Sequence, residues 1–65
     1  MRTAERIKGR VVEIEVGEAA GFGWVAAGLV LEGFPHEKGM LFEAKAQDPI
    51  EAETQLRAEI EAFFA

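Results

Sequence analysis

Residues 24–31 (WVAAGLVL) form an unbroken apolar run, and this run constrains the fold more than any other part of the chain. Successive side chains of a β-strand point to opposite faces of its sheet, so a strand here is apolar on both faces. The first face carries Trp24, Ala26, Gly28 and Val30, and the second carries Val25, Ala27, Leu29 and Leu31. A strand of this kind is typical of the middle of a sheet that is covered on both sides.

Two further strands are predicted, one before and one after this run. Residues 10–16 (RVVEIEV) and residues 40–47 (MLFEAKAQ) each alternate in the way that indicates a strand with one buried face. The inward-facing residues are then Val12, Ile14 and Val16 in the first, and Met40, Phe42, Ala44 and Ala46 in the second. Residues 17–23 (GEAAGFG) and 32–39 (EGFPHEKG) are rich in turn-forming residues and are predicted to connect the strands.

A helix is predicted over residues 48–65. Asp48 is a suitable N-cap, Pro49 fits the first helical position, and Glu51 completes a capping box. Apolar residues then recur at helical spacing on one stripe, which is predicted to pack against the sheet. The stripe consists of Ala52, Leu56, Ile60, Phe63 and Phe64.

Together these segments predict an α+β fold with two layers, in which a three-stranded antiparallel β-meander is followed by one C-terminal α-helix (β-β-β-α). Residues 1–65 are predicted to form a single domain. Residues 1–9 (MRTAERIKG) are polar and weakly patterned. We interpret them either as a basic arm or as the start of the first strand, with Gly9 marking a bulge.

The predicted sheet has a second apolar face that one helix cannot cover. A domain of 65 residues is marginally stable alone, and with no cysteine and one histidine it has no disulfide and no multi-histidine metal site to stabilise it. We therefore expect a second copy of the chain on that face, giving a dimer or a tetramer. The predicted interface comprises Val25, Ala27, Leu29 and Leu31 of the apolar run, with Phe22 and Phe34 from the loops as anchors.

The net charge of −5 disfavours nucleic-acid binding by the domain as a whole. The charge is uneven, because residues 1–10 hold four basic side chains against one acidic side chain. An alternative function is therefore nucleic-acid binding through Arg2, Arg6, Lys8 and Arg10. The same residues could instead pair with the acidic remainder of the chain or with a partner.

The chain contains no serine, cysteine, tyrosine or asparagine, which excludes nucleophilic catalysis by serine or cysteine. We expect no enzymatic activity and no cofactor. A further alternative is a small-ligand-binding protein or enzyme that uses His36, Glu37 and other carboxylates at a subunit interface. No apolar run approaches the ~20 residues of a membrane span and no signal peptide is recognisable, so we expect a cytoplasmic protein without membrane contact. The abundance of Glu and Ala with no Asn or Cys is typical of a thermophile.

Four stretches of the sequence resemble the HicB-like antitoxin family. They are residues 11–16 (VVEIEV), 23–27 (GWVAA), 33–36 (GFPH) and 48–52 (DPIEA), and the resemblance covers nearly the whole chain. It implies a HicB-type domain that stands alone, without the DNA-binding domain that full antitoxins carry. It also implies oligomerisation through the sheet and a small basic toxin as protein partner.

Overall fold

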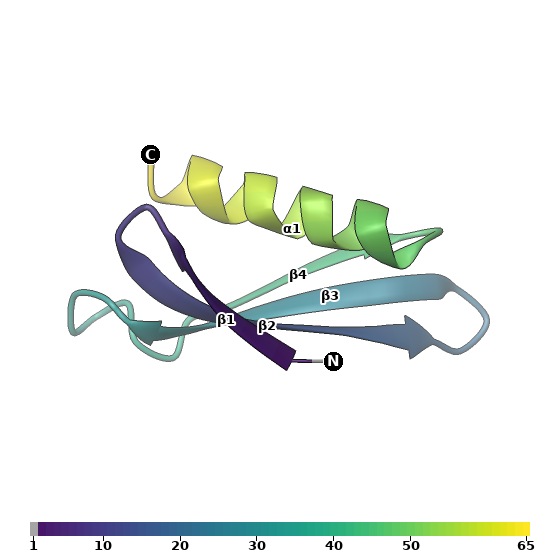
Figure 1. Cartoon of the computed structure of the whole chain (residues 1–65), viewed down its shortest axis with the longest axis horizontal. Helices are drawn as coiled ribbons and strands as arrows, with labels where there is room; N and C mark the ends of the chain where they lie inside the picture. The colour runs from purple at the N-terminus through teal and green to yellow at the C-terminus, as the bar shows by residue number, and fades with distance from the viewer. Residues whose placement is uncertain (1) are drawn as a thin grey trace.

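The computed structural model describes residues 2–65, and these form four β-strands and one α-helix (Figure 1). In chain order the elements are β1 (Arg2–Ile7), β2 (Arg10–Ala19), β3 (Gly23–Glu32), β4 (Leu41–Ala46) and α1 (Pro49–Phe63). Neighbouring strands are antiparallel and stand in the order β1-β2-β3-β4, so the sheet is a meander. The helix α1 lies along one face of this sheet (Figure 1). The α+β class, the antiparallel meander and the C-terminal helix are confirmed.

The number of strands is a correction, because the sheet has four strands and not the predicted three. Residues 2–7 are neither an arm nor an extension of the strand predicted over residues 10–16. They form a separate strand, β1, that pairs with β2. The chain reverses at Lys8 and Gly9, where φ is 50° and 82°. Two successive positive φ values are what a two-residue type I′ hairpin turn requires, so Gly9 belongs to a turn and not to a bulge. The sequence gives no alternating pattern for β1, because β1 is an edge strand in which only Ile7 is buried.

The apolar run of residues 24–31 occupies the middle of the sheet as predicted. It forms most of β3, which pairs with β2 on one side and with β4 on the other. Ala26, Gly28 and Val30 are buried on the face that α1 covers. On the opposite face the alternate residues of β3 are less buried, and Leu31 is exposed.

The core lies between α1 and the inner face of the sheet. Its largest fully buried side chains are Ile14, Leu56, Ile60, Val12 and Val30. Gly28 lets the helix approach β3 closely, because a Cβ at this position would lie 3.0 Å from Cδ1 of Ile60 and 3.3 Å from Cγ1 of Val12. The absence of a side chain at position 28 therefore sets the spacing of the two layers.

The helix begins as the sequence predicts. Oδ1 of Asp48 accepts a hydrogen bond of 2.8 Å from the backbone N–H of Glu51, and Pro49 is the first helical residue. Ala52, Leu56 and Ile60 are buried, as expected for the apolar stripe. Phe63 differs from the prediction, because it is exposed at the end of the helix while its ring contacts those of Phe42 and Phe64 edge to face.

Candidate interaction surface

The face of the sheet opposite α1 carries no second layer within residues 2–65, and we call it the open face (Figure 1). On β3, Val25, Ala27 and Leu29 of this face are half-buried and Leu31 is exposed. Leu41 of β4 stands directly opposite Leu29 and is 64% exposed. By strand register the open face consists of Arg2, Ala4 and Arg6; Val11, Glu13, Glu15 and Gly17; Val25, Ala27, Leu29 and Glu32; and Leu41, Glu43 and Lys45, while Leu31 lies at the register shift opposite Val11 and Val12.

Charged side chains flank the apolar strip of the open face. Nη2 of Arg2 lies 3.3 Å from Oε2 of Glu15, and Nε of Arg2 lies 3.9 Å from Oε1 of Glu13. The face holds three basic and four acidic residues, so its net charge is −1, whereas the whole chain carries −5. These seven residues are Arg2, Arg6 and Lys45, and Glu13, Glu15, Glu32 and Glu43.

The open face is not flat, because the small side chain of Ala27 sits among larger ones. A shallow hollow of about 270 Å³ is lined by Ala27 together with Arg2, Glu13, Glu15, Leu29 and Leu41. A neighbouring hollow of about 210 Å³ also includes Ala27, with Glu15 and Glu43 at its border. The centre of the open face can therefore receive a protruding side chain from another molecule.

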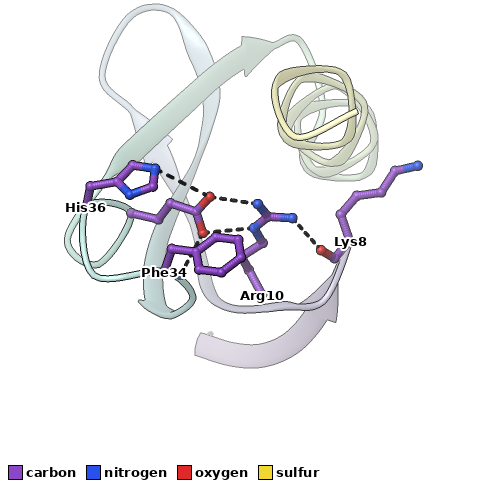
Figure 2. A network of polar contacts seen from close by, with 5 residues as sticks. Lys8, Arg10, Phe34 and His36 are labelled. Carbon is purple, nitrogen blue, oxygen red and sulfur yellow. Dashed lines mark hydrogen bonds and ion pairs between the residues drawn. The ribbon is translucent and has the colours of Figure 1, made fainter.

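A second feature, an ion pair between Arg10 and Glu37, ties the β3–β4 loop to the start of β2 (Figure 2). Nε of Arg10 donates to Oε1 of Glu37 over 2.9 Å, and Nη2 donates to Oε2 over 2.7 Å. The third donor, Nη1, binds the carbonyl oxygen of Lys8 over 2.7 Å. The carboxylate also accepts a hydrogen bond of 3.0 Å from the backbone N–H of Phe34. Every nitrogen of the guanidinium and both oxygens of the carboxylate thus have a hydrogen-bond partner within the chain.

The surroundings of this pair explain its stability. The side chain of Glu37 is 6% exposed, and the guanidinium of Arg10 lies 4.2 Å above the centre of the Phe64 ring. The hydrogen bonds from Arg10 hold the pKa of the Glu37 carboxyl below its usual range, so this carboxyl stays ionised at neutral pH. Gly33 leaves room for the carboxylate, because a Cβ there would lie 2.6 Å from Oε1 of Glu37. The pair and its neighbours therefore form a loop clamp.

Two of the four residues predicted to contact nucleic acid are in contact with acidic side chains. Arg10 is held in the loop clamp, and Arg2 is paired with acidic residues of β2. Lys8 is exposed in the β1–β2 turn, while Arg6 is exposed on the open face. The structure thus engages Arg10 in the loop clamp and leaves Arg2, Arg6 and Lys8 exposed along β1 and its turn.

The two loop phenylalanines predicted as anchors are both exposed, but they lie at different places. Phe22 is in the β2–β3 turn, and its ring lies 5.3 Å from Nζ of Lys45. Phe34 is in the β3–β4 loop, next to the loop clamp (Figure 2). Neither belongs to the open face by strand register, so the structure does not join them to the apolar strip of β3.

His36 stands beside the loop clamp, at a longer distance from Glu37 than Arg10 is. Its side chain is 79% exposed, and its Nε2 lies 3.9 Å from Oε2 of Glu37, which is already bound to Arg10. Within residues 2–65, no group of three or more His, Cys, Asp or Glu side chains is placed to hold a metal ion. In the same part of the chain, no helix has both the length and the apolar character needed to cross a bilayer.

Sequence reasoning missed Leu41 and the loop clamp for different reasons. Leu41 could have been found, because it alternates with inward-facing Met40 and Phe42 and must point to the open face. The clamp joins Arg10 and Glu37 across 27 positions, and no local pattern indicates such a pair. Comparison of the chain with protein-family models, with curated proteins and with solved structures found no match.

Proposed function

We propose that this chain is a small protein-interaction module that works as a homo-oligomer, assembled through the open face of its sheet. The single observation that carries the proposal is the apolar strip of the open face. Val25, Ala27, Leu29 and Leu31 of β3 continue into Leu41 of β4, and α1 is packed on the other side of the sheet. An apolar strip on a sheet face is stabilised when a second layer removes it from water.

The charge distribution also supports self-association through this face. Two copies of a chain with a net charge of −5 repel each other, and the repulsion is weakest where their facing surfaces are neutral. The open face has three basic and four acidic residues and is close to neutral, whereas the exposed surface of α1 carries Glu51, Glu59 and Glu61. A second copy therefore approaches the open face at a lower electrostatic cost than the helix side.

An antitoxin-like role is the more specific form of this proposal. It is supported by the sequence resemblance to HicB-like antitoxins and by the acidic surface of α1, which suits a small basic protein as partner. Co-expression with a small basic toxin of that system, followed by affinity purification through this chain, tests the role. Co-purification that is lost at high salt supports it, and no co-purification at low salt rejects it.

The two alternatives from the sequence have less structural support. Nucleic-acid binding would have to depend on Arg6 and Lys8, because Arg10 is bound to Glu37 and Arg2 faces Glu15. A ligand site at His36 would lack a free carboxylate from Glu37. A gel shift with the whole chain at low salt tests the first alternative, and a shift that disappears at higher salt would revive it.

Sedimentation velocity across a range of micromolar concentrations tests self-association directly. We expect the wild-type chain to sediment as a dimer or tetramer, and Leu41→Gln to weaken the assembly. The matched control is Ile50→Gln, because Ile50 is 77% exposed but lies on α1, away from the open face. A wild-type chain that is folded and monomeric at all concentrations would reject the proposal, as would equal effects of the two substitutions.

A further inference from the structure

From the charge pattern of the open face we infer that two copies pack face to face about a two-fold axis parallel to the strands, an inference that rests on the proposed self-association. In this arrangement β1 of one copy lies across from β4 of the other. Arg2 then meets Glu43 of the partner subunit, and the same contact occurs twice because the axis relates the two copies. The occupant of the open face is a second copy of this chain.

The strand register supplies the geometry. Arg2 pairs with Glu15, Glu15 with Ala27, and Ala27 with Glu43, so these four residues form one row across the four strands. The row begins with a cation at one edge of the sheet and ends with a carboxylate at the other. The two-fold axis runs along the strands in the interface and passes between β2 and β3. Rotation about it places the β1 edge of one copy over the β4 edge of the other. The cation of each copy is thereby placed over the carboxylate of the other.

The middle of the row fits the same arrangement. The rotation places Glu15 of each copy over Ala27 of the partner subunit, and the hollow around Ala27 has room for a longer side chain. Sheets in sandwiches pack about 10 Å apart with their strands within about 30° of each other. Arg2, which already contacts Glu15, is long enough to bridge that carboxylate and Glu43 of the partner subunit.

The other two-fold arrangement of facing sheets is electrostatically worse. An axis in the interface but perpendicular to the strands would stack β2 on β2, so that Glu13 and Glu15 of both copies would face one another. Like charges placed opposite each other at an interface weaken the association. Pairing of sheet edges is a third possibility, but it would leave the apolar strip of the open face in water. The parallel axis is the one that brings unlike charges together and buries the strip.

Charge reversal in matched pairs tests this arrangement. Arg2→Glu and Glu43→Arg each place two like-charged pairs in the dimer, so we expect each to raise the dimer dissociation constant by about tenfold or more. An equimolar mixture of the two variants restores both attractions, because each copy then presents the complement of the other. We expect this mixture to dimerise within about threefold of wild type, as measured by sedimentation velocity.

Arg6→Glu is the control, because Arg6 is on the same strand and face but is opposite no acidic residue in this arrangement. We expect it to change dimerisation much less than Arg2→Glu, and circular dichroism checks that all three variants are folded. If the wild type is an oligomer that Leu41→Gln weakens but the mixture does not restore association, the arrangement is wrong while the proposed function stands. Assemblies that grow without limit with concentration would also overturn it, because they indicate edge pairing. A wild-type chain that is monomeric would reject both this arrangement and the proposed function.

Discussion

Arg10 at the start of β2 and Glu37 in the β3–β4 loop are joined by two nearly parallel hydrogen bonds of 2.9 and 2.7 Å. This contact links two residues that are 27 positions apart in the chain but lie at the same end of the sheet, where Val11 pairs with Glu32. The guanidinium packs against the ring of Phe64 and the missing side chain of Gly33 leaves room for the carboxylate, so the contact ties the loop to β2. In a domain of 65 residues, one such contact has a large influence on stability.

Removal of one partner of the loop clamp is therefore expected to destabilise the fold strongly. Glu37→Gln leaves the largely buried guanidinium of Arg10 without its anionic partner, and an unpaired buried charge is costly. Thermal unfolding should show a clear decrease in Tm for this variant. Glu15→Gln breaks an exposed pair with Arg2 and should change Tm by much less. Equal Tm values for the two variants would show that the clamp does not stabilise the fold.

The same pair predicts how stability depends on pH. The pKa of Glu37 is lower in the folded state than its ordinary value of 4.5, because Arg10 donates hydrogen bonds to the ionised form. The folded state thus binds fewer protons than the unfolded state, so the contribution is complete above about pH 4.5 and is lost as the pH falls through the folded-state pKa. We expect the free energy of unfolding, measured with urea, to fall below this pH. Glu37→Gln should show a smaller decrease, and an unchanged decrease would contradict the assignment.

Gly28 is expected to accept a methyl group only with strain, since the helix packs directly on it. Gly28→Ala places a methyl group 3.0 Å from Cδ1 of Ile60, and overpacking of this kind costs about 1–3 kcal/mol. Gly17→Ala is the control, because it lies in β2 on the open face with nothing within 4 Å of the added Cβ. Urea unfolding should show destabilisation of the first variant only. A fully stable Gly28→Ala would show that the two layers can separate at little cost.

The β1–β2 turn makes a prediction in the opposite direction. Lys8 has a φ of 50°, which is unfavourable for a lysine and well tolerated by asparagine. Lys8→Asn should therefore stabilise the fold by up to about 1 kcal/mol, as measured by urea unfolding. Loss of stability in this variant would indicate that residues 2–7 do not form the hairpin with β2.

Much of the fold was accessible from the sequence because its signals are local. The alternation of Val12, Ile14 and Val16, the apolar run of residues 24–31 and the capping residues before α1 each depend on neighbours within a few positions. The strand β1 was not accessible, because an edge strand buries little and its turn is signalled only by Lys8 and Gly9. The prediction missed β1 because the strand buries few side chains, and not because its residues disfavour β-structure.

For the candidate interaction surface, the sequence predicted the apolar positions but not their charged surroundings. The alternation along β3 placed Val25, Ala27, Leu29 and Leu31 on one face. The row that joins Arg2 to Glu43 depends on the register of three strand pairs, which is fixed by turn geometry and by the core. Information of that kind is distributed over the whole domain and is visible only after it has folded.

The strand lengths have a consequence for misassembly. The two ten-residue strands β2 and β3 are inside the sheet, while the strands at its edges, β1 and β4, have six residues each. A foreign strand can therefore reach only a short row of unpaired backbone groups, next to charged side chains such as Arg6 and Lys45. Because the long strands are inside the sheet and the short ones at its edges, the molecule can display an apolar sheet face and still expose few backbone groups on which an amyloid fibril could grow.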